Sequence, residues 1–156
     1  MKAPLIRPAA AEDGSALAKI ARLMGAAHEP GYFDRCLDEQ EKGARCIFIA
    51  NGGEGYVQLV WRPLYAPFRR LNIPEIQDLN VVPASRRQGI GAALVKFCEE
   101  TARQKGCGEI GIGVGLHSRF GAAQRLYVRL GYVPDGAGAC YDDAPVSGGE
   151  VRSVDD

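Results

Sequence analysis

Apolar residues recur at helical spacing in two stretches near the N-terminus of the chain. The first begins after Asp13 and the second covers about residues 32–42, so each predicts a helix with one buried face. The buried positions expected are Leu17, Ile20, Ala21 and Met24 in the first helix and Phe33, Cys36 and Leu37 in the second. A short apolar run over residues 5–7, stopped by Pro8, predicts a strand before both helices.

Runs rich in β-branched and aromatic residues follow these helices. Residues 46–50 and 55–61 flank an Asn-Gly-Gly turn, which predicts a β-hairpin. Residues 75–82 predict another strand, closed by Pro83. The Pro-punctuated loop of residues 62–74 is long for a compact domain, and such loops are often functional. We therefore expect it to shape the substrate site. Its candidate residues are Tyr65, Phe68, Arg69 and Arg70.

The last third of the chain predicts two more helices around a glycine-rich strand. The helices cover about residues 87–105 and 121–130. Their inward positions are expected to be Ile90, Leu94, Phe97, Cys98 and Thr101, then Ala123, Leu126, Tyr127 and Leu130. Between them, residues 109–115 alternate glycine with β-branched residues, which indicates a strand whose bare face something approaches closely. Cys140 and Tyr141 begin a further strand.

Composition limits the class of protein. The 156 residues are 46% apolar, which is enough for one core, so we expect a single domain over residues 1–156 with residues 142–156 as a polar tail. Lysine plus arginine and aspartate plus glutamate both number 19, so no overall field attracts nucleic acid or an anionic membrane. The five cysteines form no C-x-x-C pair and are expected to be reduced. Without a signal peptide or a run of about 18 apolar residues, the chain is expected to be soluble and cytoplasmic.

A strand, a proline, two arginines and a Gly-x-Gly precede the long helix. The turn consists of Arg86, Arg87, Gln88, Gly89, Ile90 and Gly91. The first N–H groups of a helix point outward without partners, so such an end binds anions and phosphates above all. Glycine removes Cβ atoms from their path, and arginine adds charge-assisted contacts. An ordinary helix start with close packing has the same Gly-x-Gly. As no Walker lysine follows and the third glycine of a dinucleotide fingerprint falls at Leu94, a coenzyme with a pyrophosphate but no triphosphate fits better.

The Arg-x-x-Gly-x-Gly of residues 86–91, after a strand and a proline, resembles the signature of the GNAT acetyltransferase superfamily. Residues 123–132 resemble that family's fourth-helix motif, Arg7-Pro8 its N-terminal motif, and the resemblance covers about residues 4–135. It implies a mixed α/β fold with a mostly antiparallel central sheet flanked by about four helices. A parallel strand pair, splayed open between residues 79–82 and 111–115, would admit the cofactor.

The resemblance also implies an N-acetyltransferase that uses acetyl-CoA as cosubstrate. The main chain of residues 80–82 would pair with the pantetheine arm, the Val81 amide would polarise the thioester carbonyl, and the amides of residues 87–92 would hold the pyrophosphate. The cofactor-binding residues implied are Asn80, Val81, Val82, Arg86, Arg87, Gln88, Gly89, Ile90, Gly91, Ala92 and Tyr127. Many members carry an asparagine where this chain has Phe120, so that contact is lost or supplied by Ser118 or a main-chain group.

Aminolysis of a thioester requires an acid for the thiolate and a base for the ammonium. The resemblance places Tyr127 near the sulfur as the acid, although a tyrosine on an apolar stripe is also a core residue. Glu75 resembles the glutamate base of histone-acetylating members in its spacing from Arg86, and it equally fits an exposed strand-end carboxylate. We expect it to share a strand face with Gln77, Leu79 and Val81, with Asp78 on the opposite face as the second candidate base. Both histidines, His28 and His117, are interpreted as surface or loop residues, which argues against a metal site.

Two other functions fit the same turn: a regulatory module that binds CoA without catalysis, and a nucleotide-binding protein. The acceptor is expected to be a primary amine of a small molecule or peptide. Family members usually finish with two further strands, whereas this chain offers residues 139–141 and then a Gly-rich acidic stretch. Because an open sheet edge recruits another strand, either residues 150–154 form a short substitute or a homodimer covers the edge.

Overall fold

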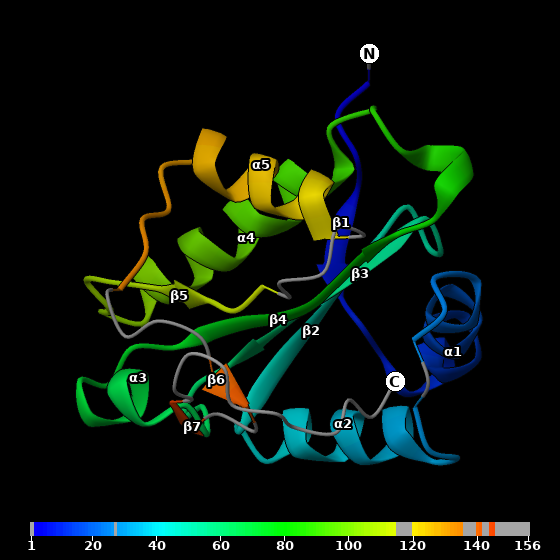
Figure 1. Ribbon diagram of the computed structural model, residues 1–156. Coiled ribbons are helices and arrows are strands. Elements are labelled where there is room, and N and C mark those ends of the chain that lie inside the picture. Colours follow the sequence, from blue (N-terminus) through cyan, green and yellow to red (C-terminus); the bar gives the residue numbers. More distant parts are fainter. Residues whose placement is uncertain (1, 27, 115–119, 136–139, 142–143, 146–156) are drawn as a thin grey trace.

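The computed structural model of the chain describes residues 2–26, 28–114, 120–135, 140–141 and 144–145 (Figure 1). The strands are β1 (Ile6–Pro8), β2 (Arg45–Ala50), β3 (Gly55–Val60), β4 (Glu75–Val81), β5 (Gly111–Ile112), β6 (Cys140–Tyr141) and β7 (Ala144–Pro145). The α-helices are α1 (Gly14–Leu23), α2 (Tyr32–Glu41), α3 (Ala66–Arg70), α4 (Ile90–Gln104) and α5 (Gly121–Arg129). No described helix is long and apolar enough to cross a membrane.

Within the described residues, β1 to β5 form one sheet in chain order. Neighbours run antiparallel except β4 and β5, which are parallel and pair only at Glu75 with Gly111 and Ile76 with Ile112. The mixed, mostly antiparallel fold with one parallel pair is thereby confirmed. Beyond Ile76, β4 continues to Val81 without a described partner on its β5 side, which is where the split was expected.

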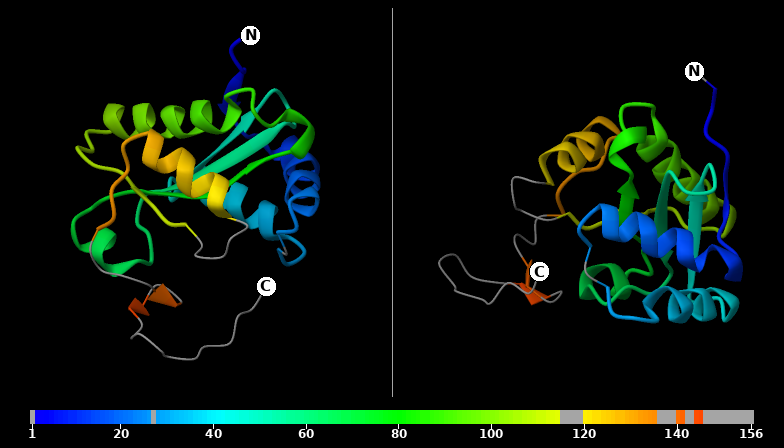
Figure 2. Two further views of the ribbon diagram at one scale, coloured as in Figure 1. Left: turned by 45° about the horizontal axis from the view of Figure 1, so that its top comes forward. Right: turned by 90° about the vertical axis from the view of Figure 1, so that its right-hand side faces the viewer.

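Helices cover both faces of this sheet (Figures 1 and 2). One core cluster packs α1 and α2 against Ile47, Ile49 and Tyr56. The other packs α4 and Tyr127 of α5 against the opposite face, which includes Val57. The expected inward positions of the first two helices are confirmed, apart from the half-buried Met24.

The long helix differs from its prediction at its start and on its inner face. It begins at Ile90 rather than near residue 87, because Arg87 and Gly89 adopt positive φ values of 62° and 78°. Val95 and Ala102 are buried where the pattern suggested Phe97 and Thr101. Phe97 is 37% exposed and sets its ring edge-on to Phe48.

A β-bulge in β4 overturns the predicted arrangement of its side chains. Tyr56 pairs with Asn80 but Gln58 pairs with Gln77, so β4 holds one extra residue between them. Asp78 occupies this bulge with φ 54°. Strict alternation therefore fails after Gln77, and Asp78 contacts Tyr56 on the α1–α2 face rather than lying opposite Glu75 and Gln77. Leu79 and Val81 pack into the other core cluster instead of sharing a face with Glu75.

The bare face of β5 is filled by the chain's own loop. A Cβ placed on Gly111 would lie 2.3 Å from the ring of Phe68, which comes from α3. Tyr65 of the same loop stacks edge-on with Phe68 and donates a hydrogen bond to Asp135 at 2.5 Å. These two aromatic residues of the 62–74 loop therefore pack within the fold, and the part of this loop in shaping the substrate site stays a prediction.

Near the C-terminus, β6 and β7 pair antiparallel with each other. This bears out the strand expected at Cys140 and Tyr141. The substitute strand expected at residues 150–154 lies outside the described residues, and the homodimer stays a prediction.

We predict that Gly111→Ala lowers the free energy of unfolding by about 1–3 kcal/mol, because its methyl group overlaps the Phe68 ring. Gly108→Ala is the matched control, since nothing lies within 4 Å of a Cβ at that position. Both variants lose the same glycine entropy in the unfolded chain, so their difference isolates the clash. Urea denaturation of both proteins measures it, and equal stabilities would show that Phe68 does not pack on β5.

Candidate active site

The turn before α4 leaves main-chain donors without partners. Gly89 is the residue before the first helical turn, and no side chain caps the helix there. The carbonyl of Gly89 accepts from the Ala93 amide at 3.0 Å, which is the first bond of the helix. The amides of Ile90, Gly91 and Ala92 therefore point out of the helix end, where its dipole also favours an anion. Arg86, Arg87 and Gln88 are exposed around this end.

Gly91 brings three elements together at this point. A Cβ on Gly91 would lie 3.3 Å from Leu126 of α5 and 3.9 Å from Val81 of β4. The first turn of α4 thus touches both the last residue of β4 and the helix that carries Tyr127. Close packing, the ordinary explanation of a Gly-x-Gly, therefore accounts for Gly91, while Gly89 is required by its positive φ.

At the end of β4, one residue directs its main-chain N–H and C=O away from β3. The Val82 amide donates to the Glu54 carbonyl at 2.9 Å, so these two residues form a hydrogen-bonded pair. Opposite pairs alternate along an antiparallel ladder, hence Gly55 and Val81 form a non-bonded pair. The N–H and C=O of Val81 accordingly point away from β3, toward the β5 side, where no described residue pairs with them. Of the three residues expected to pair with pantetheine, Asn80 and Val82 direct their main chains at β3.

Tyr127 lies in the core beside this edge. It is 8% exposed, and its ring meets Tyr132 edge-on with centroids 6.2 Å apart. Burial raises the pKa of Tyr127 to about 12, so its hydroxyl stays protonated at neutral pH. No described residue hydrogen-bonds to that hydroxyl. Tyr127 is therefore a core residue whose hydroxyl keeps its proton at neutral pH.

The two candidate bases lie at different places on β4. Glu75 is buried at the start of the strand, where its Oε1 lies 3.2 Å from the Cβ position of Gly113. Asp78 lies three residues nearer to Val81, in the bulge. Asp78 is thus the nearer of the two to Val81 along β4, whereas the Glu75 carboxylate reaches toward Gly113 just after β5.

A polar network fixes Asp78 on the α1–α2 face. Tyr56 Oη donates to Asp78 Oδ2 at 2.8 Å, and Asn80 Nδ2 donates to Oδ1 at the same distance. Gln58 Nε2 adds a bond of 3.1 Å to Oδ2. Burial and the neighbouring carboxylate raise the pKa of Tyr56 well above its ordinary range, so its hydroxyl remains a donor.

His28 joins this network, although the sequence suggested only a surface or loop residue. Its Nε2 lies 3.2 Å from Asp78 Oδ2, and its ring stacks on Tyr32 with centroids 3.9 Å apart. No motif surrounds His28, and its partner lies 50 positions away in a bulge that the sequence pattern did not reveal. His117 lies outside the described residues.

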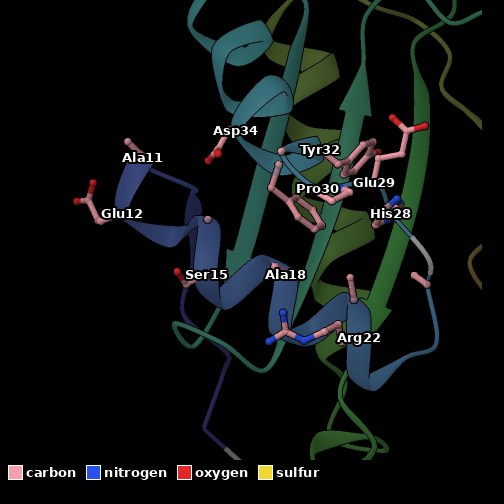
Figure 3. Close-up of a pocket in the computed structure, with 15 residues that line it drawn as sticks. Ala11, Glu12, Ser15, Ala18, Arg22, His28, Glu29, Pro30, Tyr32 and Asp34 are labelled. Carbon is pink, nitrogen blue, oxygen red and sulfur yellow. The ribbon is translucent and has the colours of Figure 1, made fainter.

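An open groove of about 640 Å³ runs between α1 and the start of α2 (Figure 3). Glu12 and Asp34 lie at one end of it, and His28 and Tyr32 lie at the other end beside the sheet. The groove therefore gives a ligand access to His28 from the α1–α2 side.

Comparison with known proteins identifies the family of the chain. The model of the acetyltransferase (GNAT) family matches residues 16–132. The chain is similar to an aminoglycoside N(6')-acetyltransferase type 1 of Klebsiella aerogenes, 42% identical over 65 residues, or 40% of this chain and 43% of that protein. It is also similar to an aminoalkylphosphonate N-acetyltransferase of Salmonella typhimurium, 42% identical over 60 residues, or 38% of each. The matched segments span less than half the length of these relatives.

Solved structures share the fold. One is a transcriptional regulator from Bacillus halodurans, with TM-score 0.72 and 22% identity, covering 89% of this chain and 99% of that one. Another is an aminoglycoside 6'-N-acetyltransferase from Acinetobacter baumannii, with TM-score 0.68 and 20% identity, covering 90% and 97%. These likenesses extend over the sheet and the helices on both of its faces.

We predict that the charge of residue 88 changes the affinity for acetyl-CoA, because the exposed side chain of Gln88 lies just before the N-terminus of α4. Gln88→Glu should weaken binding about two- to fivefold and Gln88→Lys should strengthen it by a similar factor. Both effects should shrink at 1 M salt, where exposed charges are screened. Calorimetric titration of the two near-isosteric variants measures the effect, and identical affinities at low salt would place the pyrophosphate elsewhere.

Proposed function

This chain belongs to the acetyltransferase (GNAT) family, and we propose that it transfers the acetyl group of acetyl-CoA to a primary amine of a small molecule or peptide. The observation that carries the proposal is the convergence at Gly91. The uncapped start of α4, the outward-facing main chain of Val81 and the helix of Tyr127 meet there. These are the parts that a pyrophosphate, a pantetheine amide and a thioester sulfur require.

Each part has its own task in the proposed reaction. The amides of residues 90–92, with Arg86 and Arg87, hold the pyrophosphate. The N–H of Val81 donates to the thioester carbonyl and stabilises the negative charge that develops there. Tyr127 donates its hydroxyl proton to the departing sulfur. Acetyl-CoA itself supplies the activated acyl group.

The described cysteines favour direct attack by the amine over a covalent acetyl-enzyme intermediate. Burial raises the pKa of both Cys36 and Cys98, so these thiols are poor nucleophiles at neutral pH. Burial also raises the pKa of the half-buried Cys46. A covalent acetyl-cysteine intermediate has no support from these three residues.

A regulatory module that binds CoA without catalysis needs the α4 turn but no acid or base. Tyr127 and Asp78 lie on opposite faces of the sheet and flank the same end of β4. That arrangement favours the enzyme. A panel of amines, including neamine, 2-aminoethylphosphonate, spermine and a short peptide, assayed by release of free CoA, tests this directly. Binding of acetyl-CoA without stimulated release by any amine would favour the module.

We predict that Tyr127→Phe lowers kcat about 100-fold while leaving acetyl-CoA affinity unchanged, since only the proton donor is removed from a packed ring. Because the pKa of Tyr127 is raised to about 12, the hydroxyl is protonated below that pH, and no alkaline loss of activity from Tyr127 is expected before about pH 11.

Tyr132→Phe is the matched control for this prediction. Its ring neighbours Tyr127, but its hydroxyl donates to Glu99 at 3.0 Å on α4, away from the thioester. Steady-state kinetics of both variants measures the difference. Equal rates for Tyr127→Phe and the parent protein would leave Tyr127 with a packing role alone.

A further inference from the structure

The loop between α1 and α2 places a histidine against the bulge of β4. The His28 ring lies parallel to Tyr32, with an interplanar angle of 3°, and edge-on to Phe33 at 5.4 Å. These contacts fix the plane of the ring, and Nε2 lies 3.2 Å from Asp78 Oδ2. Nε2 is buried and close to this carboxylate without the alignment of a hydrogen bond, whereas the side chain as a whole is 24% exposed.

The surroundings of Asp78 determine which nitrogen carries the hydrogen. Tyr56, Gln58 and Asn80 all donate to its carboxylate, so the group is held as an acceptor. A buried nitrogen 3.2 Å from a carboxylate oxygen is repelled as a lone pair and attracted as an N–H, so we assign the hydrogen to Nε2. The neutral imidazole then has its lone pair on Nδ1, which has no hydrogen-bond partner among the described residues.

The bulge exists at a cost in backbone energy. Asp78 is a non-glycine residue at φ 54°, a conformation that L-residues adopt with strain. An unbulged strand would direct this side chain to the opposite face, away from the groove between α1 and α2. The strained residue is therefore the one that puts a carboxylate behind His28.

We propose that His28 is the general base of the acetyl transfer and that Asp78 is its positioning residue. This rests on the proposed function. Nδ1 takes one proton from the acceptor ammonium, and the freed lone pair forms the C–N bond. The C–S bond breaks with its electron pair on sulfur, which Tyr127 protonates. The second proton of the nitrogen returns to Tyr127, and the imidazolium, stabilised by Asp78, releases its proton to solvent.

The charged and titratable groups around His28 are few. Tyr32 lies under the ring, Asp78 and Tyr56 lie at its Nε2 edge, and Arg22 lines the same groove from α1. Glu29 follows in the chain, but its carboxylate points away from the ring (Figure 3). Glu29→Gln therefore removes a charge next to His28 in the chain but leaves the contact between His28 and Asp78 unchanged, so it is a suitable control.

The decisive experiment is a pH profile of kcat/KM between pH 6 and 10, with the amine of the panel that the parent protein acetylates fastest. His28→Gln should lose about 100-fold at pH 7. The loss should shrink below about tenfold by pH 9.5, where a primary amine is increasingly neutral without help. Asp78→Asn should show a smaller loss with the same pH trend, and Glu29→Gln should follow the parent profile. Acetyl-CoA affinity should be unchanged in all three.

A uniform loss across the pH range, or no loss, would overturn the role of His28 while leaving the transferase intact. Absence of turnover by the parent protein with every amine would instead overturn the proposed function, and the base with it. Long-range ¹H–¹⁵N NMR gives a readout that needs no turnover, because the chain has only two histidines and His28→Gln assigns the signal. The hydrogen should reside on Nε2, and a hydrogen on Nδ1 would contradict the proposal.

Discussion

Among the described residues, β4 pairs with β5 at two positions and then continues for five more residues. Main-chain groups inside a protein are almost always paired, so a strand that continues without a described partner presents a demand for hydrogen bonds. Val81 packs beside the first turn of α4, whose amides also lack described partners. A ligand with a peptide-like arm and a pyrophosphate meets both demands at once. The contact between α4 and α5 at Gly91 sets how far the α4 amides lie from Val81 and from the helix that carries Tyr127.

The local elements were largely predictable from sequence because each depends on a short-range pattern. The α1 and α2 stripes and the Asn-Gly-Gly hairpin follow from periodicity and turn chemistry, and so does the existence of α4, although its start was predicted about three residues too early. The inner face of α4 was partly mispredicted, since Phe97 has helical spacing with Leu94 but stays 37% exposed, with its ring edge-on to Phe48. Periodicity predicts that a helix has an apolar face, whereas the residues at the centre of that face depend on the part of the sheet against which the helix packs.

The bulge at Asp78 shows why the site itself was harder to predict. A single extra residue exchanges the faces of every side chain after it, and nothing in Gln77-Asp78-Leu79 distinguishes a bulged strand from a regular one. The polar ring around Asp78 comes from β3 and the α1–α2 loop, which meet only in the folded chain. The close approach to the bare face of glycine-rich β5 was predicted correctly, but the sequence could not identify the neighbour, which is Phe68 of the same chain.

The placement of Tyr127 and His28 on opposite faces of the sheet has a chemical consequence. An acid and a base do their separate tasks when their environments hold one protonated and leave the other able to accept a proton. Here Tyr127 sits in the apolar core of the α4–α5 side, where burial keeps it protonated. His28 sits in a polar, partly exposed setting on the α1–α2 side. The edge of β4 separates the two environments, and a substrate carbonyl bound to the Val81 amide would lie between them. Attack from one face and departure toward the other would then follow from the way the sheet divides the molecule.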